Sequence, residues 1–316
     1  MALDMSRTTP AQPQRAGACC GQPMSGKAVA GVERPVVVGV DGSDAGMHAL
    51  DWAAEEARLR GLPLRIVHAS LWERYGEGAA EEQKAEERVL SDAVERAARW
   101  AGGPQVTAQA VPEEPAVALT VESRAAALLV VGHRGRGELA SLLLGTVSLT
   151  VAGRAHCPVI VVRGEGRTGP PPGRGGRIVV GVGEGAGSET TVAFAYGEAA
   201  LRRGEIEAVH VWRCPGSGLA EESGPHNKRR EEHIRRASDT LEAALAPVAC
   251  EHPEVPVTPR PAEGNPRDVL LAAAAGADLL VVGAERHRHT RGLQLGPVNH
   301  AVLHHARCPV AVVPHA

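Results

Sequence analysis

Short apolar runs alternate along the chain with longer segments in which apolar residues recur at helical spacing. The run VVVGV at 36–40 has the length and composition of a buried strand. The segment after it places Leu50, Ala53 and Ala57 on one helical face, and Gly61 ends that helix. The alternation continues, and it predicts strands at 36–40, 64–69, 105–111, 128–131 and 157–162 and helices at 44–60, 81–99, 115–126 and from about Ser141.

This strict alternation predicts an open, five-stranded, mostly parallel sheet with helices on both faces. Ligands of such sheets bind beyond the carboxyl ends of the strands, where the winding reverses. Composition favours the same architecture, because hydrophobic residues make up 43% of the chain and aromatic residues only 2%. A core of Val, Leu, Ile and Ala suits a parallel sheet that is covered on both faces.

The pattern starts again in the second half of the chain. Three stretches recur there: IVVGV at 178–182 repeats VVVGV, AVHV at 208–211 repeats IVHA at 66–69, and CPVAVV at 308–313 repeats CPVIVV at 157–162. Matching positions lie 142 residues apart at the first strands (36 and 178) and 151 apart at the later glycines (132 and 283). This is a tandem duplication. We expect a flexible extension at 1–33, a first domain at 34–163, a Pro/Gly linker at 164–176 and a second domain at 177–316.

Charge and hydropathy argue against two classes of partner. The net charge of −3 and the isoelectric point near 6.5 give no reason to expect nucleic acid or an anionic membrane surface. No apolar run approaches the roughly 18 residues that span a bilayer, and the N-terminus lacks the basic start and apolar block of a signal peptide. We therefore expect a cytoplasmic protein.

Glycines at fixed intervals follow the fourth predicted strand. The spacing differs from the Walker and dinucleotide fingerprints. It runs Gly132, two residues, Gly135, nine residues, Gly145 and Thr146. A phosphate needs several N–H donors at about 2.9 Å, and glycines let a loop aim its backbone without intervening side chains. A helix start beyond the loop adds unpaired N–H groups. The spacing indicates a phosphate-binding loop; the alternative is that the glycines only turn the chain.

Asp41 stands at the end of the first predicted strand. If the first and fourth strands are neighbours in the sheet, Asp41 meets the glycine loop, and two distant segments form one site. The alternative is that Asp41, which precedes Gly-Ser, caps a helix or shapes a turn.

These residues together resemble the universal stress protein family: VDGS after the first strand, IVHA in the second, the glycine spacing, the VS that follows it and the CPV that begins the last strand. The resemblance covers nearly all of residues 34–314. It implies tandem Rossmann-like domains of the adenine nucleotide α-hydrolase-like kind, which pair through their last strands. It also implies ATP binding, with or without Mg²⁺, by a stress-response protein that is not a dedicated ATPase.

Carried over position by position, the resemblance implies a binding site in the first domain. Asp41 would lie by the ribose and Ala69 by the adenine, while the glycine loop and the following helix start would hold the phosphates. The implied site residues are Gly39, Val40, Asp41, Ala69, Gly132, Arg134, Gly135, Gly145, Thr146, Val147 and Ser148.

The second repeat departs from this pattern. Gly183 replaces Asp41, and Arg286, Pro297 and Asn299 replace Gly135, Thr146 and Ser148. Pro297 has no N–H, and arginine disfavours the backbone conformations open to glycine. We therefore expect the first domain to bind most of the ATP. The second would serve as an internal partner through its last strand; alternatively, its ERHRHTR run at 285–291 binds a different anion.

Signals for catalysis or a metal are weak. His300 and His304 are four residues apart, as a zinc pair on a helix would be, but no acidic third ligand or catalytic signature accompanies them. We predict no catalytic residue and no metal site. The leading function is a nucleotide-dependent regulator, monomeric or homodimeric. The alternatives are a slow ATP hydrolase or phosphotransferase and a nucleotide-free scaffold.

Overall fold

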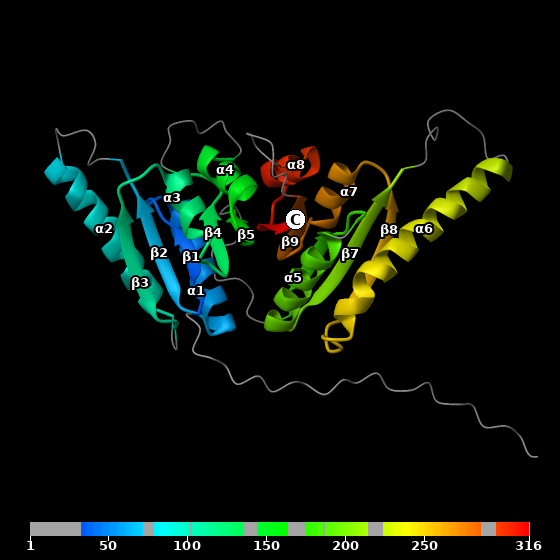
Figure 1. Ribbon diagram of the computed structural model, residues 1–316, viewed down its shortest axis with the longest axis horizontal. Helices are drawn as coiled ribbons and strands as arrows, with labels where there is room; N and C mark the ends of the chain where they lie inside the picture. The colour runs from blue at the N-terminus through cyan, green and yellow to red at the C-terminus, as the bar shows by residue number, and fades with distance from the viewer. Residues whose placement is uncertain are drawn as a thin grey trace, which may run out of the picture. The chain divides into compact units, whose positions relative to one another are not determined.

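One ten-stranded sheet runs through both halves of the chain (Figure 1). The computed structural model describes residues 33–71, 79–100, 103–135, 144–163, 175–185, 187–213, 224–285 and 295–315. The strands are β1 (Val36–Gly39), β2 (Leu64–Ala69), β3 (Val106–Val111), β4 (Leu128–Gly132), β5 (Val159–Val162), β6 (Arg177–Gly181), β7 (Glu205–Trp212), β8 (Val257–Glu263), β9 (Leu279–Glu285) and β10 (Val310–His315). The helices are α1 (Asp44–Arg60), α2 (Ala79–Ala98), α3 (Pro115–Glu122), α4 (Thr146–Arg154), α5 (Gly187–Arg202), α6 (Gly224–Ala249), α7 (Pro266–Ala273) and α8 (Pro297–His305).

The strand order is β3-β2-β1-β4-β5-β10-β9-β6-β7-β8. Within each repeat the neighbouring strands are parallel, whereas β5 and β10, which join the repeats, are antiparallel. The predicted tandem α/β fold with mostly parallel sheets is confirmed. The winding reverses between β1 and β4 in the first repeat and between β6 and β9 in the second. The predicted N-terminal extension and linker lie almost wholly outside the described residues.

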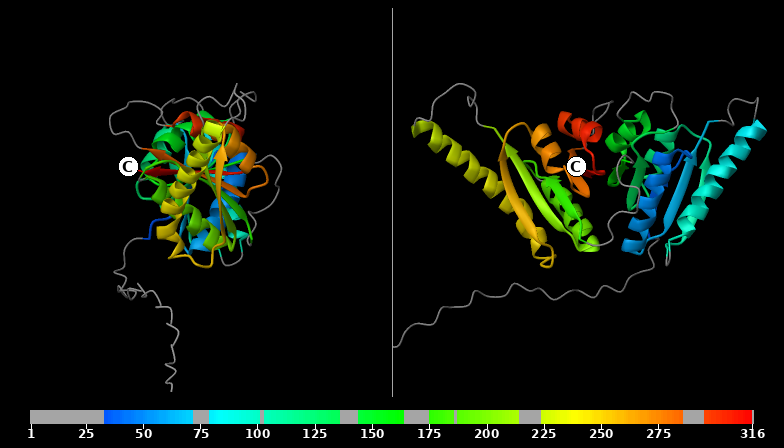
Figure 2. Two further views of the ribbon diagram at one scale, coloured as in Figure 1. Left: turned by 90° about the vertical axis from the view of Figure 1, so that its right-hand side faces the viewer. Right: turned by 180° about the vertical axis from the view of Figure 1, so that it is seen from behind.

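Helices cover both faces of the sheet (Figure 2). Alternate residues of a strand point to opposite faces. Val36 and Val38 of β1 belong to the core cluster on the face that α1, α2, α5 and α6 cover, while Val37 belongs to the cluster on the face of α3, α4, α7 and α8. These side chains are fully buried, and each contributes roughly 1.5–3 kcal/mol of hydrophobic free energy. The aliphatic composition is therefore that of a sheet whose two faces are both covered by helices.

Prolines occupy the outer edge of the second repeat. β8 reads VTPRPAE, and its Pro259 and Pro261 lie opposite Ala208 and His210 of β7. A proline has no N–H, so it interrupts the row of donors that an edge strand would present to another chain. This edge is thus a poor template for further strand pairing.

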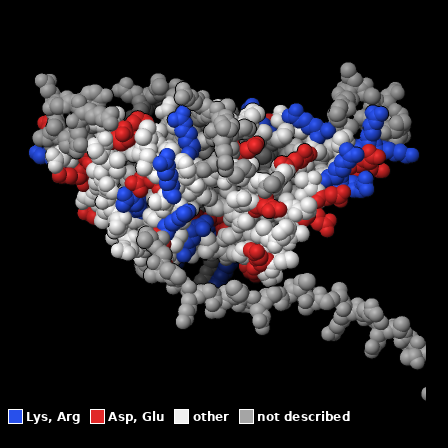
Figure 3. Space-filling model, in the orientation of Figure 1, with Lys and Arg blue, Asp and Glu red and all other residues white. Residues whose placement is uncertain are grey.

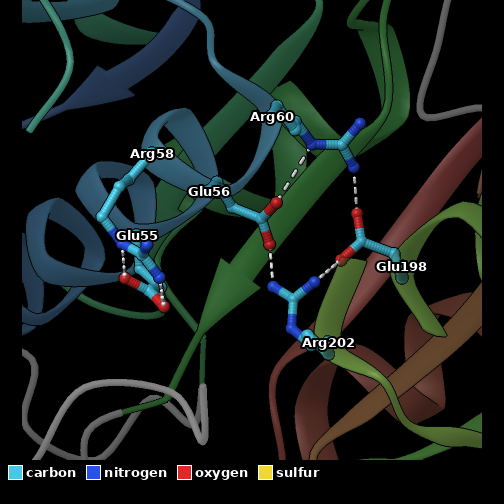
Figure 4. Close-up of polar contacts among 6 residues, drawn as sticks. All are labelled: Glu55, Glu56, Arg58, Arg60, Glu198 and Arg202. Atoms are coloured by element: carbon cyan, nitrogen blue, oxygen red, sulfur yellow. Dashed lines mark hydrogen bonds and ion pairs between the residues drawn. The ribbon is translucent and has the colours of Figure 1, made fainter. Parts of the chain in front are cut away.

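The two repeats meet at a seam formed by β5 with β10 and by α1 with α5. On the helical side of this seam lie Glu56 and Arg60 of α1 and Glu198 and Arg202 of α5, which we call the Glu–Arg ring (Figure 4). Arg60 donates to Glu56 at 3.1 Å and to Glu198, and Arg202 donates to Glu198 and to Glu56. Both glutamates are 0% exposed and Arg202 is 1% exposed.

Burial shifts the titration of the ring. Burial, followed by the charge of Glu56, raises the pKa of Glu198 to about 7, although Arg202 and Arg60 oppose the rise. Burial would also raise the pKa of Glu56, but Arg202 and Arg60 outweigh it and hold this pKa below its usual value. The two carboxylates therefore accept one proton near neutral pH, and Glu198 is the acceptor.

This titration predicts a pH dependence of stability. The folded chain protonates Glu198 at about pH 7, whereas the unfolded chain protonates it only near the ordinary value of 4.5. Between these values the folded state binds more protons, so the free energy of unfolding falls as pH rises. We expect a loss of about 1 kcal/mol from this group between pH 6 and pH 8, measured by urea unfolding. Glu198→Gln cannot titrate and should lack this component; the same slope in both proteins would contradict the assignment.

Candidate functional site

Asp41 stands just beyond β1, where β1 and β4 lie side by side. Its Oδ1 accepts hydrogen bonds from the backbone N–H and the hydroxyl of Ser43, at 3.0 and 2.6 Å. Ser43 Oγ accepts in turn from the Gly46 N–H at 3.1 Å, so Ser43 is the N-cap of α1. Asp41 is therefore not the helix cap, and the turn holds its carboxylate at the carboxyl edge of the sheet.

The loop after β4 comes into direct contact with this carboxylate. A Cβ placed on Gly135 would lie 2.6 Å from Asp41 Oδ2, closer than carbon and oxygen can approach. A Cβ on Gly132 would lie 2.6 Å from the Ala45 carbonyl oxygen, in the first turn of α1. Glycine is required at Gly132 because a Cβ there would strike the backbone of α1, whereas at Gly135 a Cβ would displace the Asp41 carboxylate. The two predicted segments meet in the structure.

The helix after the loop begins later than the sequence indicated. The prediction placed its start near Ser141, but α4 begins at Thr146, with Gly145 as an extended N-cap that has no side chain. The reason is tertiary, because the Gly145 N–H donates to the His133 carbonyl at 2.7 Å and ties this residue to the end of β4. Thr146 is exposed at the helix start. Within the part of the chain that the structure describes, the N-cap of α4 makes no side-chain capping hydrogen bond.

Ser148 has a partner within the protein. It is buried, and its hydroxyl donates to the Gly132 carbonyl at 2.6 Å. In the second repeat, Asn299 donates to the Gly283 carbonyl at 2.7 Å from the matching place. The two side chains differ, but both hold the glycine at the end of the central strand. Asn299 therefore preserves this architectural contact.

The other predicted residues frame the same edge. Gly39 allows close packing, because a Cβ there would lie 2.7 Å from Leu119 Cδ1. Val40 is buried, and its carbonyl oxygen accepts a hydrogen bond from His68 Nδ1 at 2.8 Å. Ala69 ends β2, next to β1, and Arg134 is half-buried in the β4 loop. The start of α4 carries Val147, which is half-buried.

The second repeat has a pocket of about 450 Å³ at the corresponding edge. It lies where β6 and β9 end and where α5 and α8 begin. Gly183 stands where the first repeat has Asp41, and Pro297 is the first residue of α8. Arg286 and most of the ERHRHTR run lie outside the described residues. The pocket is lined by Gly181, Val182, Gly183, Glu184, Gly187, Ser188, Thr191, Val209, His210, Val211, Pro266, Leu270, Val282, Gly283, Val298, Asn299 and His315.

His315 is a pocket residue that sequence reasoning missed. It ends β10, pairs with Glu285 of β9, and lies against the start of α5. A Cβ on Gly187 would overlap its imidazole ring, and a Cβ on Gly283 would lie 3.2 Å from its Cδ2. The only sequence signal was that an apolar strand pattern runs on into Pro314 and His315. The ring occupies the place where, in the first repeat, α1 packs directly on Gly132.

The remaining signals do not enlarge the site. His68 Nδ1 and His210 Nδ1 each lie 2.8 Å from a carbonyl oxygen at the end of the neighbouring strand, so both histidines are hydrogen-bonded within the sheet. His300 and His304 stack with ring centroids 4.4 Å apart, yet among the described residues no three His, Cys, Asp or Glu side chains are grouped to hold a metal ion. None of the described helices is both long enough and apolar enough to cross a membrane. Basic and acidic side chains are interspersed on the face in Figure 3.

A duplicated α/β chain whose parallel strands reverse their winding once in each repeat has a Rossmann-like fold. Residues 33–163 and 176–314 both match the model of the universal stress protein family, and the chain belongs to that family, as its motifs predicted. The universal stress protein Rv2005c of Mycobacterium tuberculosis is 33% identical over 297 residues, covering 88% of this chain and 96% of that protein.

A solved structure supports the fold. A universal stress protein from Archaeoglobus fulgidus DSM 4304 matches with a TM-score of 0.62 at 15% identity, covering 89% of this chain and 98% of that chain. A universal stress protein in complex with cAMP is 31% identical with a TM-score of 0.34, covering 42% of this chain and 98% of that chain.

The Ser148 contact generates a stability prediction. Ser148→Ala removes a buried donor from the Gly132 carbonyl, so we expect the free energy of unfolding to fall by about 1–2 kcal/mol in urea. Asn299→Ala should have a similar effect in the second repeat. Thr146→Ala also removes a hydroxyl, but from an exposed position, and should change stability by less than about 0.5 kcal/mol. Equal losses for Ser148→Ala and Thr146→Ala would contradict the assigned role.

Proposed function

We propose that this chain is a nucleotide-dependent stress-response regulator that binds ATP mainly through its first repeat. The observation that carries the proposal is the contact between Gly135 and Asp41 Oδ2. It brings a carboxylate from one segment beside bare backbone from another, at the reversal of the winding where such sheets bind ligands. A ribose can give hydroxyl hydrogen bonds to the carboxylate while its phosphates lie over the glycine loop.

The start of α4 supplies the donors that a phosphate chain needs. Gly145 caps the helix without a side chain, and the N–H groups that follow it point out of the helix end. Together with the helix dipole they favour an anion, and each hydrogen bond to a charged acceptor contributes roughly 1.5–3 kcal/mol. ATP, with or without Mg²⁺, fits this arrangement of donors and of Asp41.

The second repeat lacks several of these features. Gly183 offers no carboxylate, and Pro297 offers no N–H at the first position of α8. His315 fills the space beside Gly283 and Gly187. These differences support weaker nucleotide binding by the second repeat, although it retains a pocket.

Binding rather than catalysis is the better use of Asp41. Its carboxylate is fixed by two hydrogen bonds from Ser43, which suits an orienting acceptor more than a base that must activate water. Slow hydrolysis of ATP is the alternative function. Protein partners, homodimerisation and a cytoplasmic location stay predictions.

A calorimetric titration with ATP and Mg²⁺ tests the proposal. We expect one site per wild-type chain. Asp41→Gly removes the ribose acceptor, and Gly135→Arg drives a side chain against Asp41. Each variant should bind about tenfold to hundredfold more weakly, since one or two hydrogen bonds are lost.

Gly183→Ala is the matched control in the second repeat, because an added Cβ there meets no atom within 4 Å. It should leave ATP binding unchanged. The hypothesis that the first repeat binds most of the ATP would be wrong if the wild type bound ATP at two sites. It would also be wrong if one site kept its affinity in both first-repeat variants. If each chain produces many molecules of ADP, the protein is an ATP hydrolase. If it produces one molecule of ADP or none, nucleotide-dependent regulation is favoured.

A further inference from the structure

The strands of the seam carry little information about how they should align. β5 reads VIVV and β10 reads VAVVPH. The facing pairs are Val310 with Val161, Ala311 with Ile160 and Val312 with Val159. A shift by two residues would restore the backbone hydrogen bonds and keep apolar side chains on both faces. Strand pairing alone therefore specifies the register weakly.

The Glu–Arg ring, in contrast, is specific to one alignment. Glu198 and Arg202 stand 142 residues after Glu56 and Arg60, so the ring is built from matching positions of the two repeats. The two ion pairs between α1 and α5 each join an arginine of one repeat to a glutamate of the other (Figure 4). Each arginine also binds the glutamate of its own helix.

Aromatic side chains extend the same symmetry. The Arg202 guanidinium lies 5.3 Å from the Trp52 ring of α1, and the Arg60 guanidinium lies 5.8 Å from the Phe194 ring of α5. Trp52 and Phe194 also occupy matching positions. Each arginine therefore reaches across the seam to both a carboxylate and an aromatic face.

Any other alignment would leave these charges without partners. A slip of two residues along β5 moves the repeats by about 7 Å relative to one another, which is beyond hydrogen-bonding distance. The two glutamates and Arg202 are almost wholly buried, so they would remain out of contact with water as well. Unpaired buried charge is strongly unfavourable.

We propose that the Glu–Arg ring selects both the partner and the register of the seam. The α1 face of Trp52, Glu56 and Arg60 fits a face that presents a glutamate and an arginine four residues apart, and the second repeat of the same chain presents one. Covalent linkage of the repeats favours this pairing over pairing with another molecule. The burial of β5 and β10 gives the seam its strength, and the ring gives it its specificity.

Charge exchange in the full-length chain tests the proposal. Glu56→Arg with Arg60→Glu places arginine opposite Arg202 and glutamate opposite Glu198, and Glu198→Arg with Arg202→Glu does the same from the other side. Each double variant should lose the wild-type mass and radius, either because the two repeats separate or because the chain associates with further copies. Light scattering after size exclusion gives the mass, and small-angle scattering gives the radius. The variant with all four changes restores every opposite-charge contact and should regain the wild-type mass and radius.

A fourth variant separates selection from packing. Glu56→Leu, Arg60→Met, Glu198→Leu and Arg202→Met together leave an apolar seam, which should stay folded by circular dichroism but give a mixture of masses. The proposal is overturned if this variant or either double variant keeps the single mass and radius of the wild type. It is also overturned if the four-fold exchange fails to recover what the double variants lose, including when the double variants do not fold.

Discussion

The antiparallel pairing of β5 with β10 is the contact on which the rest of the described structure depends. Without it, each repeat would present a flat apolar edge strand to solvent and to other chains. With it, two five-stranded sheets become one ten-stranded sheet, and one core cluster extends from Leu50 of α1 to Leu241 of α6. The Glu–Arg ring lies on this same face. The seam thus combines hydrophobic burial, which is not directional, with charged hydrogen bonds, which are directional.

The features that the sequence predicted correctly are those that local patterns encode. Alternation of apolar runs with helical periodicity leads to a parallel sheet, because buried strands and amphipathic helices each leave a distinct period. The resemblance, carried in part by the CPV before each last strand, implied that the last strands pair, and β5 pairs with β10. Asp41 and Gly135 could be brought together from sequence because α/β topology places the ends of β1 and β4 side by side.

What could not be predicted depends on contacts between distant residues. Nothing local to Gly145 reveals that its N–H binds the His133 carbonyl and delays the start of α4. The common role of Ser148 and Asn299 is hidden because a hydroxyl and an amide look unlike in sequence, although both reach the same carbonyl. His315 enters the second pocket because β10 runs two residues past the end of its CPVAVV motif.

The Glu–Arg ring has the same residues in both repeats, whereas residues at the carboxyl edges of the two sheets differ. Glu56 and Arg60 recur as Glu198 and Arg202, because each arginine of the ring needs the carboxylate of the other repeat, and a change on one side leaves a buried charge on both. Asp41 and Gly183 need no matching partner in the other repeat, because the carboxyl edge of each sheet is formed within its own repeat. The residues at the carboxyl edge of one repeat can therefore differ from those of the other while the seam stays symmetric, and the edge in each repeat is still held by the framework that both repeats build.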